Sequence, residues 1–172
     1  MRVIVIGAVL VFGVLLETTM VSRIAVFGVT PNLMLSIIVS YSILRGDTEG
    51  AIAGFAGGLL KDVALGQSVG LFAMLGLLVG HFCGKPFRDF YRESFFLPML
   101  STGVMTVAYG LALYMFYTLT IARVNILYYI GGVVLPVAVY TMVVSVFIYR
   151  ILYGINHLIE MFEKRRHKVF NR

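Results

Sequence analysis

The chain has 172 residues, of which 60% are hydrophobic and 13% charged, and its mean hydropathy is +0.95. Soluble domains carry about 45–50% apolar and about 25% charged residues, so the composition excludes an ordinary soluble protein and indicates an integral membrane protein. The net charge of +6 comes from residues beside apolar runs, where orientation and anionic lipid explain it and no nucleic-acid partner is expected.

Six apolar segments follow one another along the chain. They predict an all-α integral membrane protein, a compact bundle of six transmembrane helices over residues 3–21, 31–44, 50–66, 69–84, 95–120 and 132–153. The second and third segments are short for spans of about 20 residues, and a five-span arrangement is the alternative. Residues 1–153 are thus predicted to form a transmembrane domain, followed by a basic cytoplasmic amphipathic tail over 154–172.

The distribution of lysine and arginine predicts the orientation, because basic residues accumulate on the cytoplasmic side of spans. With both termini cytoplasmic, only Arg23, Lys61 and Arg123 lie outside or within a span. The other eleven lie inside: Arg2, Arg45, Lys85, Arg88, Arg92, Arg150, Lys164, Arg165, Arg166, Lys168 and Arg172. A multi-pass protein with both termini in the cytoplasm is predicted.

The second segment opens with Thr30-Pro31-Asn32. Thr30 is suited to cap a helix, and proline at the first helical position loses no needed hydrogen bond. The pattern predicts a helix that begins at Pro31.

The third segment carries a small-residue ridge, with Gly50, Gly54, Gly58, Asp62 and Gly66 each four residues apart. Residues four apart are one-turn neighbours on a helix, and small residues in this pattern let another helix come close. The fourth segment repeats the pattern at three glycines, Gly76, Gly80 and Gly84. A close helix contact that involves at least one of these ridges is therefore predicted.

Asp62 stands beside Lys61 within this apolar helix, and Glu17 lies toward the end of the first one. An acid at membrane depth costs about 2.5–3.5 kcal/mol and must face protein or water, which makes it a functional-site hypothesis. The alternative for Asp62 is a cap on the turn that follows, with Lys61 reaching to the membrane interface. Glu17 is also within reach of Arg23 or of a partner, and the default for it is a structural polar contact between helices.

The segment Gly84 to Glu93 holds Lys85, Arg88 and Arg92 among aromatic residues. Such a segment tends to lie in the headgroup plane, so these residues are predicted to bind anionic lipid. Catalytic motifs of soluble enzymes are not found in the sequence, and Cys83 is the only cysteine, too few with His81 for a metal site. Neither an enzyme, a metal nor a cofactor is expected.

The order of several short motifs resembles the bacterial rod shape-determining protein MreD family. The matching stretches are Phe27–Leu35, Leu44–Gly46, Gly54–Asp62 and Gly66–Leu71. The resemblance is close over residues 3–84, and on it Pro31, Asn32, Gly54, Gly58, Asp62 and Gly70 match motif positions. Lys61 before the aspartate and Val69 in place of leucine depart from the family pattern.

The resemblance implies a non-enzymatic scaffold in the bacterial cytoplasmic membrane, part of the cell-wall elongation machinery. Such a protein is expected to bind the bitopic protein MreC, and through it MreB filaments, a penicillin-binding transpeptidase and RodA. Asp62 is then expected to fix the turn after its helix and shape an outward partner surface. The family is also similar in fold to the S-components of energy-coupling vitamin transporters, so a small-molecule-binding S-component is the alternative.

Overall fold

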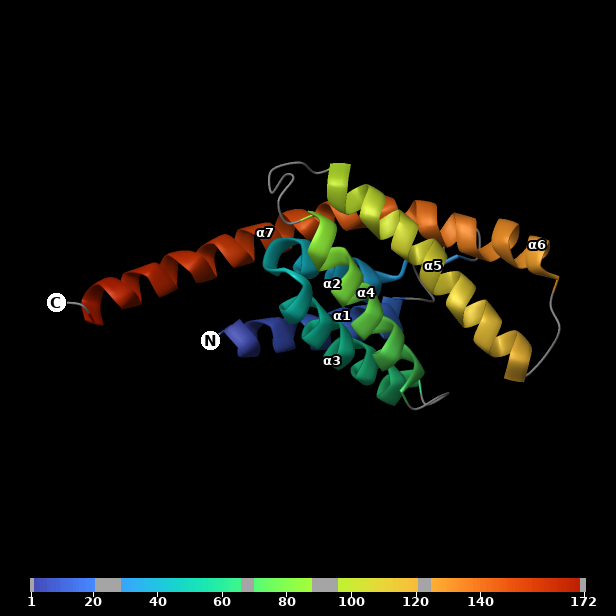
Figure 1. Ribbon diagram of the computed structural model, residues 1–172, viewed down its shortest axis with the longest axis horizontal. Helices are drawn as coiled ribbons and strands as arrows, with labels where there is room; N and C mark the ends of the chain where they lie inside the picture. Colours follow the sequence, from blue (N-terminus) through green and yellow to red (C-terminus); the bar gives the residue numbers. More distant parts are fainter. Residues whose placement is uncertain (1, 21–28, 66–69, 88–95, 121–124, 171–172) are drawn as a thin grey trace.

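The computed structural model describes residues 2–20, 29–65, 70–87, 96–120 and 125–170, and this part of the chain is helical between short connections (Figure 1). The elements are α1 (Arg2–Met20), α2 (Leu33–Arg45), α3 (Asp47–Leu65), α4 (Leu71–Phe87), α5 (Phe96–Thr120), α6 (Ile126–Tyr129), the π-helical segment η1 (Ile130–Val134) and α7 (Leu135–Phe170). The prediction of an all-α protein is confirmed.

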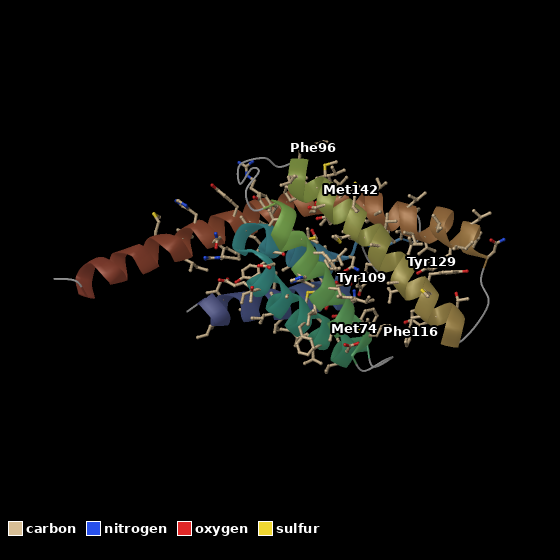
Figure 2. All side chains as sticks on the ribbon, viewed as in Figure 1. Met74, Phe96, Tyr109, Phe116, Tyr129 and Met142 are labelled. Atoms are coloured by element: carbon tan, nitrogen blue, oxygen red, sulfur yellow. The ribbon has the colours of Figure 1, made fainter. Side chains whose placement is uncertain are left out.

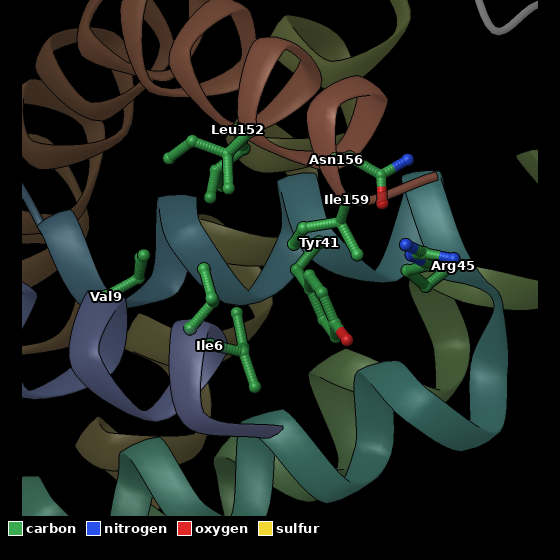
Figure 3. A pocket seen from close by; sticks show the side chains of 9 residues that line it. Ile6, Val9, Tyr41, Arg45, Leu152, Asn156 and Ile159 are labelled. Atoms are coloured by element: carbon green, nitrogen blue, oxygen red, sulfur yellow. The ribbon is translucent and has the colours of Figure 1, made fainter. Parts of the chain in front are cut away.

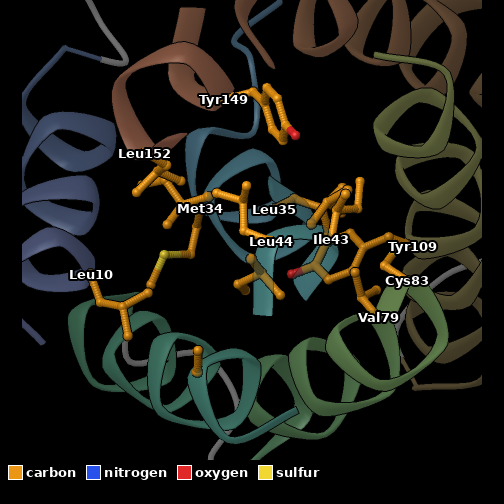
Figure 4. Close-up of a cluster of buried hydrophobic side chains, with 14 of the residues drawn as sticks. Leu10, Met34, Leu35, Ile43, Leu44, Val79, Cys83, Tyr109, Tyr149 and Leu152 are labelled. Atoms are coloured by element: carbon orange, nitrogen blue, oxygen red, sulfur yellow. The ribbon is translucent and has the colours of Figure 1, made fainter. Parts of the chain in front are cut away.

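Helix α2 forms the centre of the bundle. It contacts α1, α3, α4, α5 and α7, and Figure 4 shows these helices around it with the side chains of Met34, Leu35 and Ile43 turned into the core. Nearly every α2 residue from Met34 to Leu44 is buried. A helix that is apolar on all sides is typical of such a central position.

The outer faces of the surrounding helices are apolar as well. Val63, Phe82, Val104 and Phe147 are all more than half exposed. Two helical stretches, Phe96–Thr118 and Ile126–Ile159, are long and apolar enough to cross a membrane. An extended apolar exterior over helices of this length is what a bilayer, rather than water, accommodates.

Small hydroxyl side chains lie where α5 and α7 pack together and against α2. Thr102, Thr106, Thr141 and Ser145 are buried. Thr106 donates to the Thr102 carbonyl (2.7 Å) and Thr141 to the Val137 carbonyl (2.7 Å), one turn back in the same helix. A hydroxyl that donates to its own helix in this way can be buried between membrane helices.

Two helix boundaries differ from those predicted. The last helical run begins at Ile126 rather than 132, because Asn125 caps it by accepting a hydrogen bond from the Leu127 amide (3.1 Å). The glycine pair Gly131-Gly132 falls within η1 and does not interrupt the run. At its other end α7 continues to Phe170, so most of the predicted tail over 154–172 belongs to the same helix, which extends away from the bundle (Figure 1).

The ends of the chain lie on one side of the molecule. Figure 1 shows α1 beginning on the side toward which α7 runs to its end. Helices α5 and α7 pack together along part of their length and diverge toward α6. Figure 2 places Tyr129 of α6 on the side facing α5, where its ring centre lies 5.1 Å from that of Tyr114.

Candidate functional site

Four charged or polar residues gather where α1 and α3 end and α2 and α4 begin; we call Glu17, Asn32, Lys61 and Asp62 the charged end. The Lys61 Nζ atom lies 2.6 Å from Glu17 Oε1, with the two side chains 13% and 15% exposed. The same Nζ lies 3.4 Å from Asn32 Oδ1. Three helices are thereby joined at this end of the bundle.

Glu17 also satisfies the first turn of another helix. Its Oε2 accepts a hydrogen bond from the Met34 amide (3.0 Å), and Asn32 Oδ1 accepts one from the Leu35 amide (3.1 Å). The first amides of a helix lack partners within it and carry the positive end of the helix dipole. A carboxylate at this position therefore balances both the free donors and the dipole.

Asp62 does the same for α4. Its two oxygens accept from the Phe72 amide (3.1 Å) and the Ala73 amide (3.0 Å), and the side chain is only 3% exposed. Gly70, just before α4, has a φ of 98°, a backbone conformation that side-chain-bearing residues adopt at a cost. Asp62 thus caps the start of the fourth helix from the end of the third, whereas the alternative drawn from the sequence was a cap on the turn between them.

Lys61 is turned toward the other helices of the charged end, where it contacts Glu17 and Asn32. Its ammonium lies 5.4 Å from the centre of the Phe72 ring, which in turn stacks on Tyr109 with ring centres 6.4 Å apart. An ammonium over an aromatic face gains a cation–π attraction in addition to the ion pair. Burial against Glu17 and Phe72 keeps the lysine inside the bundle.

The start of α2 corrects another prediction. Asn32, rather than Thr30, is the capping residue, and the helix begins at Leu33, after Pro31. The backbone amide of Asn32 donates a hydrogen bond to Thr141 Oγ1 (3.1 Å). This bond connects the start of α2 to α7. Sequence reasoning missed the contact because nothing local links residues more than a hundred positions apart.

Gly54 and Gly58 lie in the contact between α3 and α4, where the two backbones meet closely. A methyl group added to Gly54 would overlap the Gly76 carbonyl, and one added to Gly58 would overlap the Phe72 carbonyl. A methyl group added to Gly80 would likewise overlap the Gly50 carbonyl. The contacting residue on α4 moves back by four positions for every four positions forward along α3. Both glycine ridges therefore belong to one antiparallel helix contact.

The remaining predictions concern the basic segment, Arg23 and a metal site. Arg88, Arg92 and Arg23 lie outside the described residues, as does the Lys85 side chain. Within the described part of the chain, three or more His, Cys, Asp or Glu side chains nowhere gather closely enough to hold a metal ion. Glu17 and Asp62 are instead engaged by an ammonium and by backbone amides.

Fold and site together define a helical membrane protein whose buried acids hold helix ends in place. Comparison with protein families then gives a match to the family described as rod shape-determining protein MreD, over residues 1–159. The chain belongs to this family, whose members are membrane proteins that determine cell shape. Comparisons with curated proteins and with solved structures gave no match.

Proposed function

We propose that this protein is a non-enzymatic scaffold of the bacterial cell-wall elongation complex. In this role it binds MreC in the cytoplasmic membrane and connects MreB filaments to a penicillin-binding transpeptidase and RodA. Membership of the rod shape-determining family over residues 1–159 is the observation that carries the proposal. The use of Glu17 and Asp62 to hold backbone amides and a lysine within the bundle supports a structural role.

The proposal includes six spans with both termini in the cytoplasm. Helix α1 begins and α7 ends on the same side of the molecule (Figure 1). This arrangement supports an even number of membrane crossings. On this arrangement the charged end faces outward, and Arg45, at the end of α2, faces the cytoplasm. The outer surface around Glu17, Asn32 and Asp62 is then the proposed docking face for MreC.

Asp62→Asn tests the link between the charged end and function. An amide keeps the shape of the carboxylate but turns an NH₂ group toward one of the two α4 amides, so a buried donor loses its acceptor, at a cost of about 1–3 kcal/mol. We expect weaker co-purification of MreC and wider cells when the variant is the sole copy. Asp47→Asn, in the partly exposed first turn of α3, is the matched control.

Protein level is measured in the same cells, because a misfolded variant would be degraded. Wider cells at a normal level of Asp62→Asn protein would support the proposed docking face. Unchanged level, MreC recovery and cell width would contradict a role for the Asp62 charge.

A further inference from the structure

An apolar groove runs along the bundle between α1, α2 and α7. It has a volume of about 730 Å³ and is lined by side chains that include Phe12, Leu16, Leu33, Ile37, Ile148 and Ile151. Toward the start of α1 it continues into a smaller pocket, with which it shares Val5, Val9, Leu152 and Ile155. The two form one depression on the side of the bundle.

The smaller pocket adds polar groups at one end. Figure 3 shows the Arg45 guanidinium and the Asn156 amide together at that end, with Ile6 and Val9 farther along. Tyr41 also lines the pocket, and its hydroxyl donates to the Glu49 carboxylate (3.0 Å). A guanidinium has five N–H donors, so Arg45 can bind a phosphate while it keeps another partner.

The length of the groove limits what fits into it. From Ile4 to Leu16, the α1 residues that line it rise roughly 18 Å at 1.5 Å per residue. One leaflet of the hydrocarbon core is about 15 Å thick, half of about 30 Å. The groove is therefore long enough to hold an acyl chain of one leaflet, and it is shorter than the roughly 30 Å that a partner helix needs to cross the membrane.

We propose that this depression is a binding site for one anionic phospholipid. An acyl chain lies along α1 and α7, and the phosphate binds the Arg45 guanidinium with the Asn156 amide as a second donor. The charge of Arg45 selects an anionic headgroup, and the apolar walls select the chain. The phosphate end of the site, at Arg45, lies at the opposite end of α2 from the charged end, and the site does not depend on the proposed scaffold role.

Native mass spectrometry of the full-length protein in mild detergent tests the site. The protein is titrated with phosphatidylglycerol and, separately, with phosphatidylcholine of the same acyl chains. We expect one tightly bound phosphatidylglycerol, and Arg45→Gln should weaken its binding about tenfold, toward the level of phosphatidylcholine. Arg150→Gln removes a charge from an exposed arginine of α7 that does not line the depression and should change little.

A second pair of variants tests the acyl-chain position. Ala8→Trp fills the groove from α1 and should weaken both lipids, whereas Ala64→Trp, at an exposed alanine of α3, should not. Val144→Trp fills the groove from α7 and replaces Ala8→Trp if that variant unfolds. The proposal would be overturned if Arg45→Gln and Arg150→Gln had equal effects on lipid binding, or if the groove-filling tryptophan variants bound lipid as well as the wild type does. It would also be overturned if a polypeptide were bound in place of lipid.

Discussion

At the scale of single residues, the charged end supplies hydrogen-bond acceptors to the starts of two helices. Helices α2 and α4 each begin inside the protein, with amides that need acceptors. A carboxylate from the end of the preceding helix supplies them, Glu17 for α2 and Asp62 for α4. The acids that stand out in an apolar sequence are therefore explained by the helix starts they face.

The ion pair of Lys61 and Glu17 should be strongly coupled. The two side chains are largely buried, and removal of one partner from such a pair leaves an uncompensated charge and costs up to about 3–5 kcal/mol. Glu17→Gln and Lys61→Met should each lower the midpoint of thermal unfolding in detergent. The unfolding midpoint of the double variant should fall by less than the sum of the two single decreases. Decreases that simply add would contradict the coupling.

Exchange of the two charges gives a sharper form of this test. Glu17→Lys with Lys61→Glu restores a pair of opposite charges but leaves the Met34 amide facing a donor instead of an acceptor. We therefore expect the exchanged protein to remain less stable than the wild type. Full recovery of the unfolding midpoint would show that the cap on α2 contributes little.

Gly70 should be needed for its backbone conformation and not for space. Its φ is 98°, and a Cβ atom added there would meet nothing within 4 Å. Gly70→Ala should lower stability by about 1–2 kcal/mol, because an L-residue is strained in this region. Gly7→Ala, at a glycine with equally open surroundings in α1, is the control, and equal behaviour of the two in thermal unfolding would contradict this reason.

At the scale of elements, the α3–α4 contact is set by glycine spacing. The repeat of four in both segments predicted a close contact, and the structure shows that it is internal to the chain. The sequence also located most helix ends to within a few residues. It could not show which helix lies at the centre, since α2 is no more apolar locally than α1 or α4, and only packing distinguishes them.

Two alanine substitutions on α3 should separate backbone contact from side-chain contact. At Gly54 the added methyl overlaps the Gly76 carbonyl, which cannot move without its helix, so we expect a loss of about 1–3 kcal/mol in unfolding free energy. At Gly57 the nearest atom is the terminal methyl of Met34, the flexible end of a side chain that can rotate away. Equal stability of the two variants in detergent would argue against the close backbone contact.

The partner choices within the charged end illustrate what the sequence left open. Adjacent helical residues point about 100° apart, which predicted that Lys61 and Asp62 need not pair. It did not identify Glu17 as the partner of Lys61, because that choice depends on how α1 packs against α3. The Arg45 pocket escaped notice for the same reason, since its walls come from three helices.

At the scale of the whole molecule, the charged end and the Arg45 pocket lie at opposite ends of α2. If both termini are cytoplasmic, tags placed at either end should be labelled only after the inner membrane is opened. A residue of the short α6 helix that is strongly exposed, such as Leu127, should be labelled from outside when replaced by cysteine. Labelling of Leu127→Cys and a terminal tag from the same side would contradict the proposed topology.

The scaffold role is tested most directly by mild-detergent capture of the tagged protein from its own membranes, with mass spectrometry of the proteins that accompany it. The account predicts recovery of MreC together with wall-synthesis enzymes, and reduced recovery with Asp62→Asn. Recovery of an ATPase module and its coupling subunit, without MreC, would contradict it and favour a transporter S-component instead.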